Sequence, residues 1–184
     1  MFGTTLARKL SLAPHLSLLQ RKARRLGLIA PEDWIVLAVH RGCYHYGNPE
    51  KAAKQVSPTE FSNEELAALL LSVANPYDPL LIRVAAQLLS APETDIRLLV
   101  RLCQLENALC PLAWIVRAAA ATEPGNDLWN ALHREIDKLA RRSIAFPEAV
   151  LPHPSRFRIE TGFQRFSINK TIERRWLRPI PKSS

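Results

Sequence analysis

Prolines divide this chain of 184 residues into a helical middle and an end that cannot form a continuous helix. Because proline fixes φ and lacks an amide hydrogen, it can begin a helix but breaks one from within. Pro79 and Pro111 each stand at the start of a segment whose apolar residues recur every three or four positions, as in an amphipathic helix. Pro147, Pro152 and Pro154 interrupt the chain after residue 142. We therefore expect helices up to that point and an extended arm over residues 144–184.

Polar residues at the segment starts predict where the helices begin. Ser62 and Glu65 form a capping box, in which the hydroxyl accepts a backbone amide and the carboxylate bonds back. Asp78, Thr94 and Asn126 are expected to cap three further helices, because a short polar side chain can satisfy a free amide of the first turn. The fold class that follows is all-α.

A shorter helix is expected upstream, from Pro31 to His40, with Gly42 ending it. Three tryptophans have aliphatic neighbours at helical spacing and are predicted to lie in the core. They are Trp34, Trp114 and Trp129. In the arm, alternation over Arg156–Glu160 is typical of a short strand, for which the sequence offers no evident partner strand.

The middle of the chain is predicted to form two similar helical hairpins. Pro79 and Pro111, each at the start of a second helix, lie 32 positions apart, a spacing found among helical-repeat proteins. Single hairpins cannot bury both faces and therefore stack. A HEAT-like stack of antiparallel hairpins and an irregular helical bundle both explain this pattern.

Charge is segregated along the chain. The net charge is +8, and no acidic residue precedes Glu32. A basic amphipathic segment over residues 1–30 and the basic arm over residues 144–184 flank a helical domain, residues 31–143, that is mildly acidic over most of its length. Such asymmetry predicts either basic ends that contact a polyanion or basic ends that fold onto the acidic middle.

The candidate binding residues lie in these two basic ends. The cations that could contact a polyanion are Arg21, Lys22, Arg24, Arg25, Arg156, Arg158, Arg165, Lys170, Arg174, Arg175 and Arg178. The arm also interleaves aromatic residues, which could stack on bases or dock onto the body. They are Phe157, Phe163, Phe166 and Trp176.

Signals for catalysis are weak. His40, Cys43 and His45 place three metal-binding residue types within six positions, which raises the hypothesis of a small metal-dependent enzyme. A structural zinc site normally needs four ligands in recognisable pairs, and the sequence supplies no such pairs. We therefore assign no catalytic residue, no cofactor and no metal ligand, and expect a non-catalytic protein.

Partner and compartment follow from the same features. No stretch is long and apolar enough for a membrane-spanning helix, and three cysteines without a CxxC pair predict a reducing compartment. We expect a cytoplasmic location, with an organellar one as the alternative because the basic N-terminus resembles a transit peptide. The function expected is that of an interaction or scaffold protein presenting a helical surface to another protein. The alternative is an RNA- or DNA-binding accessory factor that uses the arm.

Overall fold

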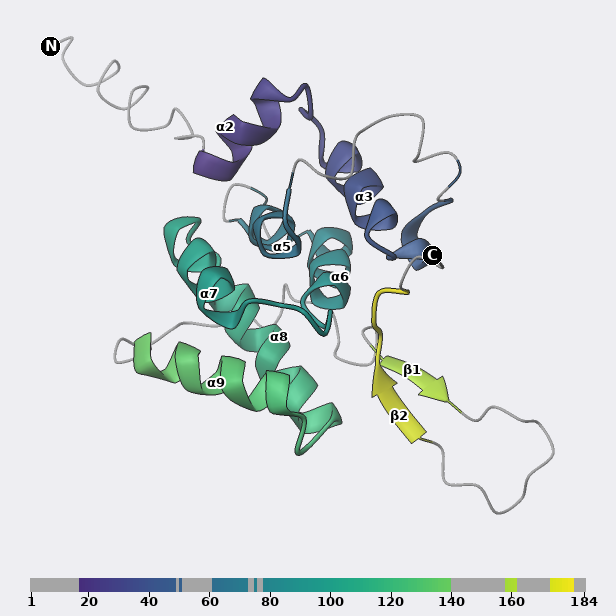
Figure 1. Cartoon of the computed structure of the whole chain (residues 1–184), viewed down its shortest axis with the longest axis vertical. Helices are drawn as coiled ribbons and strands as arrows, with labels where there is room; N and C mark the ends of the chain where they lie inside the picture. Colours follow the sequence, from purple (N-terminus) through teal and green to yellow (C-terminus); the bar gives the residue numbers. More distant parts are fainter. Residues whose placement is uncertain are drawn as a thin grey trace, which may run out of the picture.

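The computed structural model describes residues 17–48, 50, 61–72, 75, 78–139, 158–161 and 173–180. Within these residues, seven α-helices and one 3-10 turn form a helical body with two short strands at its side (Figure 1). The helices are α2 (Leu18–Arg25), α3 (Pro31–His40), α5 (Asn63–Leu71), α6 (Pro79–Leu88), α7 (Ile96–Leu105), α8 (Leu109–Thr122) and α9 (Asp127–Leu139). The 3-10 turn is η1 (Tyr44–Tyr46), and the strands are β1 (Arg158–Thr161) and β2 (Glu173–Trp176). The all-α prediction is confirmed for the body.

Most predicted helix starts are confirmed by their capping hydrogen bonds. The Glu65 amide donates to Ser62 Oγ at 3.1 Å, and the Ser62 amide donates to Glu65 Oε2 at 3.0 Å, which completes the capping box. Asp78 caps α6 and Asn126 caps α9, each through Oδ1. These caps depend on groups within three residues of each other, so the sequence alone can specify them.

The predicted cap at Thr94 is wrong by one residue. Asp95 is the N-cap of α7, because its Oδ1 accepts the Arg97 and Leu98 amides at 3.0 Å each. The Thr94 hydroxyl instead donates to the Ala91 carbonyl at 2.8 Å and holds the preceding turn. Both residue types can cap, and the position of the first helical turn selects between them.

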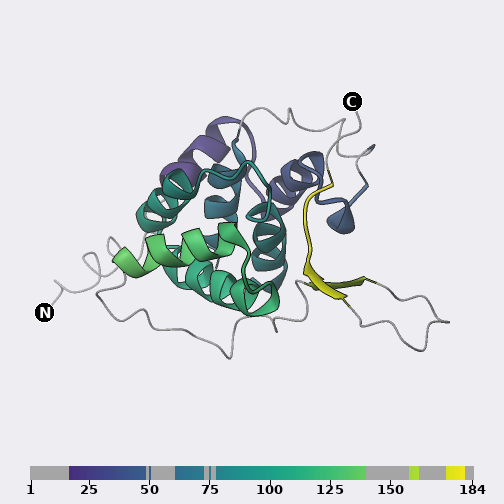
Figure 2. The same cartoon turned by 60° about the horizontal axis from the view of Figure 1, so that its bottom comes forward.

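Helix α5 lies at the centre of the body, where it contacts α2, α3, α6 and α7 (Figures 1 and 2). Its residues from Leu66 to Leu71 are all buried, because neighbours surround it on several sides. Helix α9 packs across α7 and α8. The three tryptophans predicted to be in the core are buried, with Trp129 completely so. None of the helices in the described residues is long and apolar enough to cross a membrane.

The strand predicted within Arg156–Glu160 does have a partner, although no local signal in the sequence indicates it. Strand β1 pairs antiparallel with β2, and Arg158 lies opposite Trp176. The chain then runs on past β2 along one side of the helical body (Figure 2). We call residues 176–180 the C-terminal strap. The predicted boundary between the helical domain and the arm, at residues 143 and 144, lies outside the described residues. Helix α2 belongs to the predicted N-terminal segment, and it packs on α5.

Candidate functional site

Helix α2 is fixed to the body through one buried face and two carboxylates. Leu19 and Ala23 are buried in the core. Buried Glu106, which follows α7, accepts the Leu19 amide hydrogen through Oε1 at 3.1 Å, at a helix N-terminus where negative charge is favourable. Glu65 of α5 pairs with Lys22, with 2.7 Å between Oε2 and Nζ. The charge of Lys22 is therefore neutralised by a carboxylate of the protein itself.

The other cations of α2 face outward. Arg21, Arg24 and Arg25 are exposed. Among the described residues, no carboxylate forms an ion pair with any of them. Their charge is therefore available to a partner, in contrast with the charge of Lys22.

Large apolar side chains lie among these arginines. Leu18 is 57% exposed, Leu26 39% and Ile29 70%. The two leucines border a shallow depression of about 270 Å³, and Arg21 and Arg25 also line it. We call this exposed surface the α2 patch, and its members are Leu18, Arg21, Arg24, Arg25, Leu26 and Ile29.

On the other side of the molecule, Trp176 anchors the C-terminal strap. Its side chain is only 1% exposed, and its indole Nε1 donates to the Ala86 carbonyl of α6 at 3.0 Å. Its ring meets the ring of Trp129 edge to face, with 5.5 Å between the centroids. Such aromatic pairs add about 0.5–1.5 kcal/mol to the free energy of burial.

Side chains of α6 and of the turn after it bind the backbone of the strap. The Ser90 hydroxyl donates to the Leu177 carbonyl at 3.0 Å. The Gln87 Nε2 donates to the Arg178 carbonyl at 2.9 Å. Two successive carbonyls of the strap are thus satisfied by the body rather than by a neighbouring strand.

Gly42 allows the far end of the strap to approach the body. The Ile180 amide donates to the Gly42 carbonyl at 3.0 Å. Gly42 has φ +96°, and a Cβ atom there would lie 2.2 Å from the Ile180 carbonyl oxygen. A side chain at position 42 is therefore excluded both by the backbone conformation and by the strap.

Glu123, in the turn between α8 and α9, holds the strap electrostatically. Its Oε1 accepts the Trp176 amide at 2.7 Å and Arg178 Nη1 at 2.9 Å. Its Oε2 accepts Arg178 Nη2 at 2.7 Å, Trp129 Nε1 at 3.0 Å and Asn126 Nδ2 at 3.1 Å. One carboxylate therefore joins the strap, α9 and the turn before α9.

These donors also decide the pKa of Glu123. Partial burial of the carboxylate raises the pKa, since it disfavours the charged form. Hydrogen bonds from Arg178, the Trp176 amide and Trp129 favour the charged form and outweigh burial, so the pKa is lowered from its usual value. The carboxylate is thus ionised at neutral pH, as the pairing with Arg178 requires.

The structure divides the predicted binding residues of the C-terminal arm into three sets. Arg178 and Trp176 lie against the body. Arg158, Arg174 and Arg175 lie on β1 and β2, where Arg174 is opposite Glu160. The remaining predicted residues lie outside the part of the chain that the structure describes, and they are Arg156, Phe157, Phe163, Arg165, Phe166 and Lys170.

His40, Cys43 and His45 do not form a metal site. His40 is buried at the end of α3, whereas His45 is exposed and its ring meets Tyr46 edge to face. Burial raises the pKa of the Cys43 thiol to about 12, so the thiol is neutral at physiological pH and a poor nucleophile. Across the described residues, no three His, Cys, Asp or Glu side chains gather in a way that could hold a metal ion.

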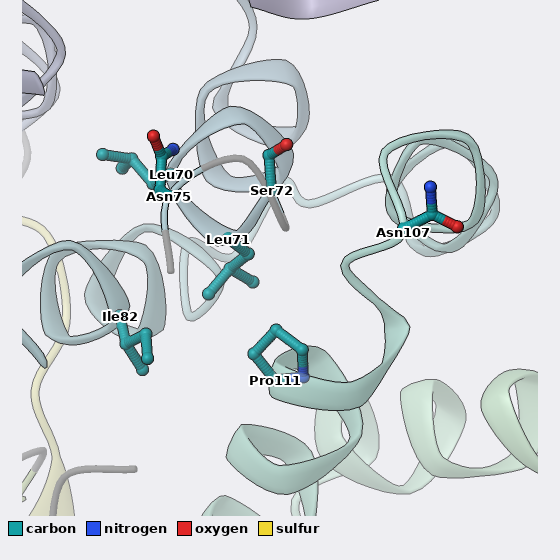
Figure 3. A pocket seen from close by; sticks show the side chains of 7 residues that line it. All are labelled: Leu70, Leu71, Ser72, Asn75, Ile82, Asn107 and Pro111. Carbon is teal, nitrogen blue, oxygen red and sulfur yellow. The ribbon is translucent and has the colours of Figure 1, made fainter. Parts of the chain in front are cut away.

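Two further hollows lie among the described residues. The cavity in Figure 3 has a volume of about 10 Å³, which is no more than one water needs. Its lining comes from α5 and the residues after it, from α6, from the turn after α7 and from the start of α8: Leu70, Leu71, Ser72, Asn75, Ile82, Asn107 and Pro111. A larger cleft of about 540 Å³ adjoins the strap, within the size range of ligand sites. It is lined by His40, Arg41, Asn63, Ala91, Pro92, Glu93, Arg178, Pro179 and Ile180.

Sequence reasoning missed the residues that receive the strap. Glu123 is followed by Pro124 and Gly125, a pattern that indicates only the end of a helix, and nothing near Gln87 or Ser90 indicates a partner far along the chain. We call the receiving surface the strap groove, which consists of Gly42, Ala86, Gln87, Ser90, Glu123 and Trp129. Comparison with family models, with curated proteins and with solved structures finds no match to this chain.

Proposed function

We propose that this protein is a non-catalytic interaction protein whose α2 patch binds an acidic surface of another protein. The observation that carries the proposal is the gathering of exposed arginines and exposed large apolar side chains on one short segment, from Leu18 to Ile29. Contacts from Glu106 and Glu65 hold α2 against the body, so the outward face of the helix is presented in a defined orientation.

The apolar members of the patch favour a protein over a bare polyanion. Protein interfaces combine buried apolar anchors with arginine, which is enriched in them. A phosphate backbone, by contrast, is bound mainly through cations, and Leu18 and Ile29 would contribute little to it. An acidic partner with its own apolar residues would satisfy both parts of the patch.

Binding of RNA or DNA is the alternative proposal, because guanidinium groups also contact phosphates. Among the side chains that the structure describes in the C-terminal arm, Trp176 is buried and Arg178 is paired with Glu123. This alternative would therefore draw on Arg21, Arg24 and Arg25 as well as on residues outside the described part.

Finer expectations from the sequence remain proposals. The helices α5 and α6 on one side, and α7 and α8 on the other, would be the two copies of a stacked hairpin. A cytoplasmic location, with an organellar alternative, likewise remains a prediction from composition.

Site-specific photocrosslinking tests the proposed function. A benzophenone amino acid replaces Ile29 in the full chain, which is irradiated in an extract of the source cells. In one variant Arg21→Glu and Arg25→Glu reverse the charge of the patch. In the control, Arg97→Glu and Arg101→Glu reverse two exposed arginines of α7 that have the same spacing.

We expect adducts with an acidic protein that the α2 variant loses and the α7 control keeps. Raising the salt concentration should weaken adduct formation, because the exposed charges are screened. Adducts that nuclease digestion removes would favour the nucleic-acid alternative. Equal labelling by both variants would contradict a role for the patch.

A further inference from the structure

The strap lies in its groove in the manner of a bound peptide. Its backbone is extended, and it bonds to the body through the Trp176 amide, the Leu177 and Arg178 carbonyls and the Ile180 amide. Recognition of an extended peptide commonly joins main-chain hydrogen bonds, which supply affinity, to side-chain pockets, which supply specificity. The strap groove has both features.

Two side chains of the strap supply the specificity. Trp176 fills a closed pocket, where Trp129 packs on the indole ring and the Ala86 carbonyl accepts its Nε1 hydrogen. Two residues later, Arg178 forms a bidentate pair with Glu123. A guanidinium group fits a carboxylate in this way, with two parallel bonds, whereas a lysine does not.

The groove offers more contacts than the strap uses. The cleft of about 540 Å³ is lined by Arg178, Pro179 and Ile180 of the strap and by residues of the body, among them Arg41 and Glu93. Ile180 is 55% exposed at the edge of this cleft. A longer segment placed in the groove could fill the cleft and gain contacts that the strap leaves unmade.

We propose that the strap groove is a recognition site for an extended segment of a partner protein that carries a tryptophan and, two residues later, an arginine. The strap occupies the groove as an internal ligand and is displaced by that segment. The apparent association constant for the partner is then the intrinsic constant multiplied by the fraction of molecules whose groove is free of the strap. Displacement is favourable only for a segment that also uses the adjoining cleft.

A peptide-binding assay on the full chain tests this inference. The ligand is a fluorescein-labelled peptide with the sequence of residues 173–180, and a scrambled peptide of equal charge is its control. Three chains are compared by fluorescence anisotropy: the unchanged chain, Arg178→Ala and Trp176→Ala. The two substitutions weaken the strap to different degrees, so a folding defect in Trp176→Ala leaves the Arg178→Ala measurement intact.

We expect the peptide to bind Arg178→Ala about tenfold or more tightly than the unchanged chain, because the internal ligand no longer competes fully. Adding Glu123→Gln to this variant should weaken peptide binding by about tenfold, since the bidentate pair is lost. The scrambled peptide should bind at least about tenfold more weakly to all chains, because it cannot place tryptophan and arginine together in the groove.

Two results would overturn the inference. The first is absence of peptide binding to a strap variant whose far-ultraviolet circular dichroism matches that of the unchanged chain. The second is equal affinity of all chains for both peptides. The Arg21→Glu and Arg25→Glu variant should bind the peptide unchanged, so failure of the α2 proposal and failure of this one are distinguishable.

Discussion

Replacing Glu123 with glutamine should loosen the C-terminal strap and lower the free energy of unfolding by about 1–4 kcal/mol. Glutamine has nearly the same size as glutamate, so the change removes charge and one acceptor without opening a cavity. The oxygen that remains can still accept the Trp176 amide. The new amide group then faces Trp129 Nε1 and Arg178 Nη2, which are donors themselves.

The magnitude follows from the burial of those donors. Trp129 is completely buried, and a buried donor that loses its acceptor costs about 1–3 kcal/mol. The side chain of Arg178 is 39% exposed, so water can replace part of its pairing and the loss there is at most about 1 kcal/mol. The two contributions together give the expected range.

Urea unfolding followed by circular dichroism measures the effect, and amide hydrogen exchange at residues 176–180 reports whether the strap is released. Glu135→Gln is the matched control, because Glu135 pairs with Lys138 on the exposed surface of α9 and should leave both readouts unchanged. The reasoning is refuted if Glu123→Gln behaves like this control. It is also refuted if stability falls while exchange in the strap stays the same.

Three further predictions concern pH, a glycine and a helix cap. Because the pKa of Glu123 is lowered from 4.5 in the folded protein, its contribution to strap docking should be complete at neutral pH and lost as the pH falls through that lowered value. Amide protection factors of the strap, measured in an acid titration, should therefore fall; protection factors that stay constant until the whole body unfolds would contradict this. Gly42→Ala should lower the free energy of unfolding by at least about 2 kcal/mol, since it adds a clash with Ile180 to a left-handed backbone. Gly125→Ala is the control: its backbone is also left-handed, at φ +89°, but the added Cβ meets nothing within 4 Å. It should lower the free energy of unfolding by only about 1 kcal/mol in the same urea titration. Ser62→Ala should lower the stability of the body by about 1 kcal/mol through loss of the α5 cap, and an unchanged unfolding midpoint would show that the cap contributes nothing.

Charge segregation in the sequence predicted either basic ends that contact a polyanion or basic ends that fold onto the acidic middle. The structure shows which acidic residues of the middle bond to the two ends. Glu65, Glu106 and Glu123 all belong to the acidic middle of the chain, and each bonds to one of the two ends. Lys22 forms an ion pair with Glu65, whereas Arg21 on the same helix is exposed. Composition alone cannot separate two neighbouring cations on one helix, because the difference depends on which side faces α5.

The sequence by itself determined the helices of this protein. The caps at Ser62, Asp78 and Asn126 join groups that are two or three residues apart, so their hydrogen bonds form wherever the local chain allows. Apolar periodicity likewise identified Trp34 and Trp129 as core residues, because burial of a helix face follows from its own pattern.

Only the tertiary structure decided the strap groove. Trp176 and Ala86 are 90 residues apart in the chain, and Gln87 and Arg178 are 91 apart. No local signal couples such positions, since each residue is also compatible with an exposed site. The groove exists because the packing of α6, α8 and α9 brings one carboxylate, one aromatic ring, one backbone acceptor and two side-chain donors to the same place, and the strap is the segment of this chain that satisfies them.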